Sequence, residues 1–388
     1  MTLMHRTAMY PKTSQIVWVD QPDELARLID TISRQPIIAV DTESDSLYSY
    51  FEKVCLVQIS IPTVDYLVDP LRLDISALGA VFADPAVEKV FHAAEYDILS
   101  LKRDYGFSFT NLFDTMLAAR ILGWKKYGLG ALLAEHFGVQ LNKRFQRYNW
   151  GQRPLSEAAL DYARLDTHYL LPLREIQVRA LQQARRLREA QEAFERQTLV
   201  EPSAKHFDPD DYWRVKGARD LDPHQLAVLK ELYVLRDTLA RELDRPPFKI
   251  MTDATLVHLA KTQPASFRNL TTVKGLSNRI VSRYGRQILA AVRQGQAAPP
   301  LQIPSPNHRH PYDHATLSRY ELLRRWRNQL AARRGVEPDV IISNHSLMDI
   351  ARHNPPSLKA LSRLGILGEW QYETYGETLL RVLKSGTS

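Results

Sequence analysis

The chain has 388 residues, more than one hydrophobic core ordinarily serves, so two or three domains are expected. With 44% hydrophobic and 24% charged residues its composition is globular, which argues against wholesale disorder. The single cysteine, Cys55, excludes an internal disulfide and a four-cysteine zinc site and fits a reducing cytosol. No apolar run approaches the roughly 18 residues of a membrane span. The N-terminal residues lack the apolar core of a signal peptide. We therefore expect a soluble, cytoplasmic protein with no membrane partner.

The net charge of +7 is unevenly distributed along the chain. Residues 201–388 hold 28 Lys and Arg against 19 Asp and Glu, whereas the preceding part is slightly acidic. The densest basic stretch, 261–310, has eight Lys and Arg and no acid. Clustered cations favour a polyanion such as nucleic acid. A solvated basic face without a ligand is the alternative that charge alone leaves open.

In chain order, the first 120 residues contain four apolar runs typical of strands, bounded by proline and polar residues. Helical periodicity dominates after Asp114, and beyond about residue 208 only amphipathic helices are expected. Strands followed by helices predict an α/β or α+β layer arrangement for the first 200 residues. The predicted strands are 37–44, 54–61, 65–70 and 87–93.

The C-terminal part contains a repeated unit on either side of a proline-rich stretch. The stretch 297–311 has five prolines in 15 residues, which indicates a semi-rigid linker. Seven positions recur at an offset of 91, with a one-residue slip around Gly275 and Gly365. Duplication of a helical unit of about 80 residues explains them. The first members of the pairs are Pro247, Leu256, Ala260, Pro264, Leu270, Tyr284 and Gly285; the second are Pro338, Leu347, Ala351, Pro355, Leu361, Tyr375 and Gly376.

Two pairs of polar residues have a spacing that places each pair on one face of an element. Asp41 and Glu43 lie two apart at the end of the first predicted strand, so their side chains project from the same side. Tyr162 and Asp166 lie four apart on a helix with Ser156 as its expected N-cap. Each pair is therefore predicted to present its polar groups together.

A further acid, Asp97, follows the last predicted strand within HAAEYDILSLK, which indicates the start of a helix. Four carboxylates in one cleft would repel each other strongly unless hard divalent cations with oxygen ligands balanced them. Paired metal ions are the recurrent device for phosphodiester hydrolysis. Taken alone, each acid is more often an ordinary surface residue, so the prediction depends on the combined spacing.

That combined pattern resembles the DEDD superfamily of 3′→5′ exonucleases. The tyrosine four residues before the last aspartate is typical of the DEDDy branch, since the histidine branch would have His where this chain has Asp161. The segments CLVQIS, FHAAEYDI, FDTMLAARILG and WGQRPLSEAALDYARLDTHYLLPL look like ribonuclease D. The duplicated unit looks like the helicase-and-ribonuclease-D C-terminal (HRDC) domain.

The resemblance implies a fold class and an activity. The expected fold is an α/β exonuclease domain with a ribonuclease H-like mixed sheet and flanking helices, followed by two small all-α helical bundles. The expected activity is 3′→5′ hydrolysis of RNA from a free 3′ hydroxyl, releasing nucleoside 5′-monophosphates, with tRNA precursors as substrates. No obligate protein partner is inferred. The expected boundaries are 1–200 for the exonuclease domain, 208–295 and 312–388 for the HRDC domains, and 296–311 for the linker.

The resemblance also implies roles for the five polar residues. Two magnesium or manganese ions would be bound by Asp41, Glu43, Asp97 and Asp166. Tyr162 has a reference pKa near 10, too high for an efficient general base at neutral pH. Orienting the nucleophilic water by a hydrogen bond is the role that we expect for Tyr162.

Candidate contacts to the RNA are less specific. The segment 143–153 mixes cations with aromatic residues, which is how single strands are held, although its aromatics could instead pack beneath a structured loop. His92 could touch the terminal nucleotide or be a packed strand-end histidine. Asp114 is interpreted as a helix N-cap. The candidate substrate-binding residues are His92, Lys143, Arg144, Arg147, Tyr148, Trp150, Lys274, Arg279 and Arg283.

Two other functions are compatible with the same residues. A DNA exonuclease could use the same acids, because distinguishing ribose requires contacts to the 2′-hydroxyl. A non-catalytic nucleic-acid-binding protein could retain the fold, but the complete acidic set argues against it.

Overall fold

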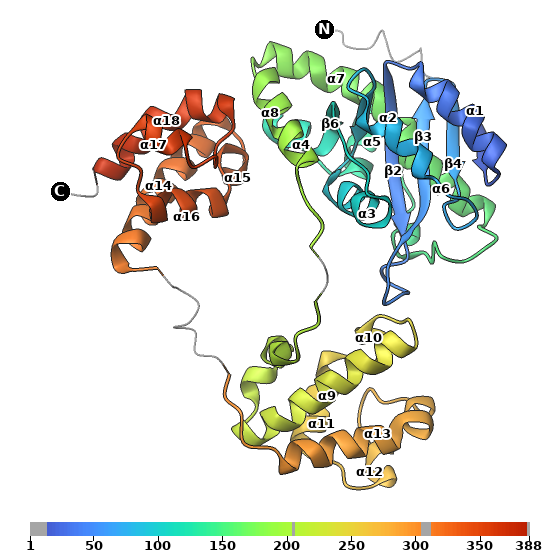
Figure 1. The fold of residues 1–388 in the computed structure, drawn as a ribbon. Coiled ribbons are helices and arrows are strands. Elements are labelled where there is room, and N and C mark those ends of the chain that lie inside the picture. The colour runs from blue at the N-terminus through green and yellow to red at the C-terminus, as the bar shows by residue number, and fades with distance from the viewer. Residues whose placement is uncertain (1–13, 204–205, 304–311, 386–388) are drawn as a thin grey trace. The chain divides into compact units, whose positions relative to one another are not determined.

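A computed structural model describes residues 14–203, 206–303 and 312–385 (Figure 1). Within them the chain forms two compact units. The first unit comprises the residues up to 44, residues 54–202 and those from 312 onward, and the second comprises 45–53 and 203–311. The second half of the predicted proline-rich linker 296–311, residues 304–311, lies outside the described residues.

The first unit is built on a six-stranded mixed sheet with the order β1-β4-β3-β2-β5-β6. β2–β3 and β3–β4 are antiparallel, whereas β1–β4, β2–β5 and β5–β6 are parallel. The mixed sheet confirms the predicted fold class. The strands are β1 (Gln15–Val19), β2 (Ile37–Ser44), β3 (Val54–Ile61), β4 (Val64–Val68), β5 (Glu88–Phe91) and β6 (Leu112–Asp114).

Helices flank this sheet and bury its central strands. All eight residues of β3 are buried, as expected for a Val- and Ile-rich strand with both faces covered. α6 packs on β2, β3 and β4. The helices of this sheet domain are α1 (Pro22–Ser33), α2 (Gly79–Ala83), α3 (Glu95–Tyr105), α4 (Thr115–Leu122), α5 (Leu129–Phe137), α6 (Glu157–His168), α7 (Leu170–Gln183) and α8 (Leu187–Thr198).

The C-terminal half contains two copies of one helical unit. Equivalent leucines, Leu256 and Leu347, are fully buried in their respective cores, and so are Ala260 and Ala351. The shared pattern of buried positions explains why both copies fold alike. The first helical copy consists of α9 (Pro223–Glu242), α10 (Pro247–Ile250), α11 (Asp253–Thr262), α12 (Phe267–Thr271) and α13 (Asn278–Ala297). The second helical copy consists of α14 (His314–Arg334), α15 (Pro338–Ile341), α16 (Asn344–His353), α17 (Leu358–Ser362) and α18 (Glu369–Lys384).

The second helical copy packs against α4 and α8 within the first unit. Arg334 forms an ion pair of 2.5 Å with the buried carboxylate of Glu189 on α8. Arg120 on α4 reaches Glu337 and Asp339 at 2.8 and 2.6 Å. The two ion pairs of Arg120 occupy acidic side chains of the second copy in docking against the sheet domain.

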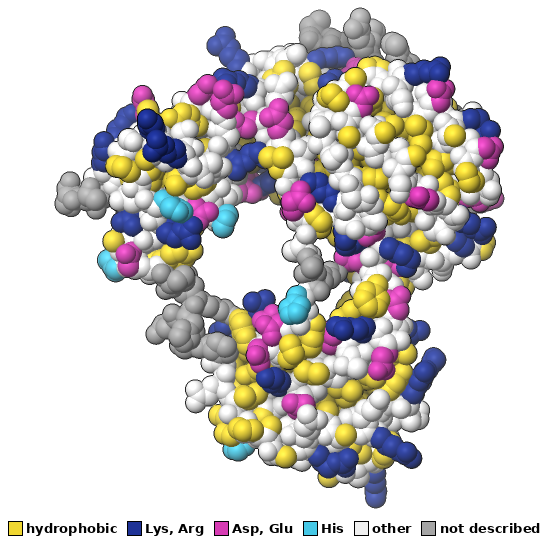
Figure 2. Space-filling model, in the orientation of Figure 1, with side chains coloured by type: hydrophobic (Ala, Val, Ile, Leu, Met, Phe, Trp, Pro, Cys, Tyr) yellow, Lys and Arg dark blue, Asp and Glu magenta, His cyan; other side chains and the backbone are white. Residues whose placement is uncertain are grey.

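The first helical copy carries much of the excess positive charge. Lys and Arg side chains gather over α12 and α13 in the space-filling view (Figure 2). Lys274, Arg279 and Arg283 are all exposed, and none of them forms an ion pair within the described residues. Among the described helices, none combines the length and the hydropathy needed to cross a bilayer.

Candidate active site

β2 places two acids on one face of the sheet. Asp41 and Glu43 alternate with Thr42 along the strand, so their side chains share a face and Thr42 lies on the other. Antiparallel pairing with β3 continues through both acids, and the register shifts directly after Glu43. β5 pairs with β2 only as far as Ala39. The acids therefore lie on the stretch of β2 that extends beyond β5.

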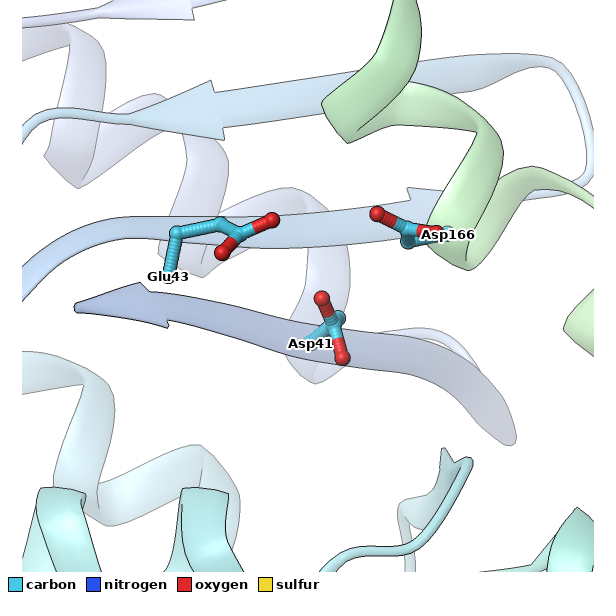
Figure 3. Close-up of side chains that lie close together, drawn as sticks. All are labelled: Asp41, Glu43 and Asp166. Carbon is cyan, nitrogen blue, oxygen red and sulfur yellow. The ribbon is translucent and has the colours of Figure 1, made fainter. Parts of the chain in front are cut away.

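α6 contributes Tyr162 and Asp166. The Ser156 side chain caps this helix by accepting a hydrogen bond from the Ala159 N–H, as predicted. Carboxylate oxygens of Asp41, Glu43 and Asp166 all lie within 4.8 Å of one another. The three carboxylates converge on one point between β2 and α6 (Figure 3). The structure thus brings together three of the four predicted metal ligands.

The fourth predicted ligand, Asp97, lies in the first turn of α3 and is not part of that three-residue cluster. One of its oxygens accepts hydrogen bonds from the Thr42 N–H and hydroxyl, at 3.0 and 2.5 Å. Because β5 does not pair with β2 at this level, the Thr42 N–H needs another acceptor, and Asp97 supplies it. Asp97 is therefore held against the backbone that carries the other two acids.

Asp114 orients the chain leading to Asp97. Its fully buried carboxylate accepts hydrogen bonds from the Met116 and Leu117 N–H groups, which confirms it as the N-cap of α4. The same carboxylate accepts from the N–H groups of Ala93 and Ala94, just before α3. Ala93 has a φ of 62°, a strained conformation for a non-glycine residue. These bonds stabilise the turn from which α3 begins.

The four carboxyl groups are electrostatically unusual. Burial, followed by the charges of Asp97, Asp166 and Glu43, raises the pKa of Asp41 well above its ordinary value. Burial, followed by Asp166 and Asp97, does the same to the pKa of Glu43. Burial raises the pKa of Asp97 to about 7, against the hydrogen bonds from Thr42. Burial also raises the pKa of Asp166 to about 8.

This acidic cluster fits a divalent cation. No Lys, Arg or His in the described part of the chain forms an ion pair with any of the four carboxylates. Buried carboxylates without a counter-charge are costly, and hard cations with oxygen ligands relieve that cost. Asp41, Glu43 and Asp166 have the chemistry and the proximity that such an ion requires.

Tyr162 stays protonated beside these acids. Burial, followed by the negative charges of Asp166, Glu43 and Asp41, raises the pKa of its hydroxyl far above the ordinary value. Its ring packs against Phe145 at a centroid distance of 5.4 Å. Tyr162 can therefore donate a hydrogen bond at this site but cannot serve as a base near neutral pH.

The predicted RNA-binding segment 143–153 is only partly open. Trp150 is 2% exposed and Phe145 3%, so their rings pack inside the domain, which is the alternative to RNA stacking that the sequence left open. The reason is that both rings pack next to Tyr162. Tyr148 is half-buried. The exposed cations of this segment are Lys143, Arg144 and Arg147.

His92 is a packed residue in this structure. Its Nδ1 lies 2.9 Å from the Thr115 hydroxyl, and burial lowers its pKa to about 4, against the opposite effect of Asp114. It is neutral at physiological pH, which weakens its candidacy as a phosphate ligand. Sequence reasoning gave no role to Gln58, which pairs with Asp41 across the sheet and places its Nε2 3.5 Å from that carboxylate.

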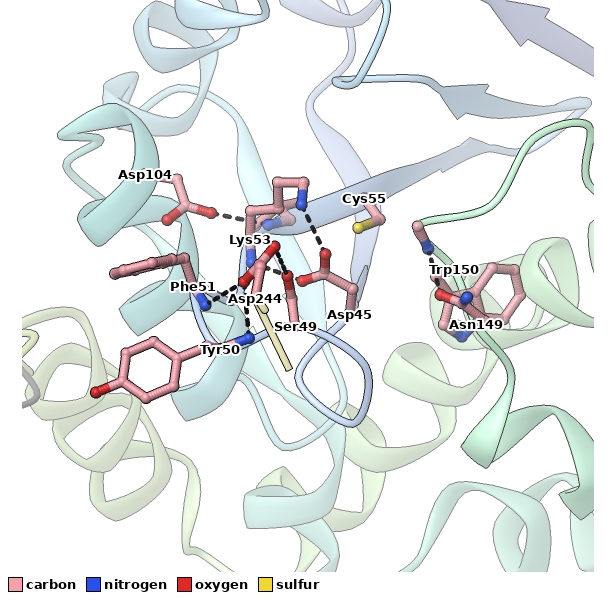
Figure 4. A network of polar contacts seen from close by, with 12 residues as sticks. Asp45, Ser49, Tyr50, Phe51, Lys53, Cys55, Asp104, Asn149, Trp150 and Asp244 are labelled. Atoms are coloured by element: carbon pink, nitrogen blue, oxygen red, sulfur yellow. Dashed lines mark hydrogen bonds and ion pairs between the residues drawn. The ribbon is translucent and has the colours of Figure 1, made fainter. Parts of the chain in front are cut away.

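The segment after β2, residues 45–53, belongs to the second unit. The Asp244 carboxylate accepts hydrogen bonds from the Ser49 hydroxyl and from the N–H groups of Tyr50 and Phe51, at 2.6, 2.9 and 3.0 Å (Figure 4). Asp244 had no signal in the sequence, because its partners are about 195 residues away. The connection between the acid-bearing strand and β3 is thus anchored to the end of α9.

Comparisons with known protein families agree with this geometry. The 3′-5′ exonuclease family matches residues 16–182, and the HRDC domain matches twice, at 225–292 and 316–383. The two HRDC matches confirm the duplication inferred from the offset of 91.

Full-length relatives and solved structures give the same result. Ribonuclease D of Jannaschia sp. is 30% identical over 374 residues, covering 93% of each chain. Ribonuclease D of Acidiphilium cryptum is 29% identical, covering 97% of this chain and 95% of that one. The catalytic core of RRP6 from Trypanosoma brucei is 30% identical with a TM-score of 0.67, covering 73% of this chain and 80% of that one. The chain therefore belongs to the ribonuclease D family and is a 3′→5′ exoribonuclease.

Proposed function

We propose that hydrolysis takes place at the acidic cluster of β2, α3 and α6, with two magnesium or manganese ions bound by Asp41, Glu43, Asp97 and Asp166. The observation that carries this proposal is the convergence of three partly or fully buried carboxylates within 4.8 Å, without a basic partner among the described residues. When bound, divalent cations supply the positive charge that stabilises the anionic transition state of phosphodiester hydrolysis. Asp97 completes the set from the adjoining helix.

Tyr162 orients the attacking water in this proposal. Its hydroxyl remains protonated beside Asp166, so it donates a hydrogen bond to an oxygen in the site. The packing of its ring on Phe145 limits the positions that the hydroxyl can adopt. Fixed donors of this kind lower a barrier because they need no reorganisation during the reaction.

The exposed cations hold the RNA that enters this site. Lys143, Arg144 and Arg147 contact phosphates near the cluster, and Lys274, Arg279 and Arg283 attract the body of the RNA to the first helical copy. In this arrangement residues 1–200 form the exonuclease domain, and 208–295 and 312–388 are the HRDC domains on either side of the 296–311 linker. Stable RNAs such as tRNA precursors are the proposed substrates, and they are shortened from a free 3′ hydroxyl.

A 5′-labelled RNA with a 3′ hydroxyl, compared with the same RNA ending in a 3′ phosphate, tests the proposal. We expect a stepwise ladder from the free end with Mg²⁺ or Mn²⁺, and none with EDTA or the blocked end. Asp41→Asn should abolish the ladder while leaving the melting curve cooperative. A ladder that survives EDTA or Asp41→Asn would refute the site, and faster loss of a matched DNA would make the enzyme a DNA exonuclease.

A further inference from the structure

An exposed aromatic ring lies at the edge of the acidic cluster. Tyr96 immediately precedes Asp97 in the first turn of α3, and it is 45% exposed. No other aromatic side chain in the described part of the first unit is as exposed. Exposed aromatic rings on which bases stack are one means by which proteins hold single-stranded RNA.

The ring of Tyr96 is tethered at both ends to the strand and helix that carry the acids. Its hydroxyl lies 3.0 Å from the hydroxyl of Ser44, the residue after Glu43. Its backbone continues into Asp97, which is bonded to Thr42 on the same strand. The ring is therefore held next to the cluster, and a ligand that stacks on it loses less side-chain entropy than on a free ring.

The charges around Tyr96 indicate which part of an RNA it would meet. Glu95, which immediately precedes it in the chain, carries an exposed carboxylate. A phosphate placed against the ring would face like charge, whereas a nucleobase is neutral and has a π-face that stacks on tyrosine. Because every base has such a face, stacking here would be tolerant of sequence.

We propose that Tyr96 is the stacking platform for a nucleobase at the 3′ end of the bound RNA. This proposal rests on the proposed active site. The platform places the end of the strand beside the acidic cluster, whatever its base. Tyr96 acts on the binding of the strand and not on the chemical step. Its removal should therefore change KM far more than kcat.

The test compares Tyr96 variants on RNAs with and without the stacked base. For an RNA with all its bases, Tyr96→Ala is expected to raise KM about 10-fold with kcat nearly unchanged. Tyr96→Phe keeps the ring but loses the tether to Ser44, so a rise of about two- to three-fold is expected. The matched control is Leu199→Ala, which removes a 73% exposed side chain from the same unit and should leave KM unchanged.

Abasic substrates locate the stacked base and can overturn the proposal. One RNA carries an abasic residue at its 3′-terminal position, and a second RNA carries an abasic residue at its penultimate position. The Tyr96→Ala penalty should vanish for one of them, because that RNA has no base to stack. An equal penalty on all three RNAs would mean that Tyr96 shapes the site without touching a base. An unchanged KM with the intact RNA would exclude any stacking role.

Binding measurements separate this proposal from the proposed active site. In the Asp41→Asn background, fluorescence anisotropy reports RNA affinity without turnover. Adding Tyr96→Ala should weaken binding of the intact RNA about 10-fold, and should have no effect on the abasic RNA identified above. If Asp41→Asn were still active, the catalytic assignment would fail, while this binding contrast would still decide the role of Tyr96.

Discussion

The acidic cluster of the sheet domain and the basic face of the first helical copy both concentrate charge of one sign, but in opposite settings. Asp41, Glu43 and Asp166 are held together in a partly or fully buried site, where burial raises their pKa values. Lys274 and Arg279 are spread over an exposed surface. Charges in a low dielectric interact strongly at short range, whereas exposed charges act over longer distances and are screened by salt. The first arrangement suits a bound ion and chemistry, and the second suits the capture of a polyanion.

Among the variants that test this comparison, Asp166→Asn is expected to have the largest effect, a loss of kcat. Losing one of three converging carboxylates should lower kcat by on the order of 10³-fold, because ion binding and transition-state stabilisation both suffer. Asp161→Asn is the matched control, since its carboxylate lies on the same helix but is 64% exposed and pairs with Arg164. A comparable loss of kcat in Asp161→Asn, or full activity in Asp166→Asn, would contradict the assignment.

The stability of the metal-free protein should depend on pH through the acidic cluster. The pKa values of Asp97 and Asp166 are raised to about 7 and about 8, so near pH 6 the folded state binds protons that the unfolded state has released. Stability then falls as the pH rises from the unfolded pKa near 4 through the folded values. In EDTA, Tm should drop by ~5 °C between pH 5 and pH 8.5.

Two controls assign that pH dependence. Added Mg²⁺ should raise Tm most at high pH, where the carboxylates are ionised, and should flatten the profile. Asp166→Asn removes one of the titrating groups and should also flatten it. A Tm that rises from pH 5 to pH 8.5 in EDTA would show that the cluster is not protonated in the folded protein as described.

Features of the sheet domain differ in how far they could be predicted from the sequence. The pairs Asp41–Glu43 and Tyr162–Asp166 depend on the local periods of a strand and a helix, so their shared faces could be predicted from spacing. The bonds of Asp97 to Thr42 and the burial of Trp150 depend on tertiary packing, which spacing does not report. β1 and β6 were not predicted, and the three-residue β6 is too short to show a period.

Charge reversal on the basic face should affect binding and spare the chemistry. The triple variant Lys274→Glu, Arg279→Glu and Arg283→Glu is expected to raise KM by roughly 10-fold at physiological salt, with kcat nearly unchanged. The slope of log KM against log salt should fall by about 2 to 3, one for each lost phosphate contact. A large fall in kcat, or an unchanged salt slope, would mean that RNA does not use this face. The variant should keep the pH profile of Tm in EDTA.

The smallest effect is expected from the same reversal in the second helical copy. Lys359, on α17, stands at the position that Arg268 occupies on α12, and nearby Arg363 is also exposed. This copy uses acidic residues, among them Glu337 and Asp339, to dock against the sheet domain. Lys359→Glu with Arg363→Glu should therefore change KM less than two-fold and leave the salt slope within about 1 of the wild-type value. A change in KM and salt slope as large as that of the triple variant would show that both copies hold RNA. The two copies would then have kept the same binding surface despite their different charges.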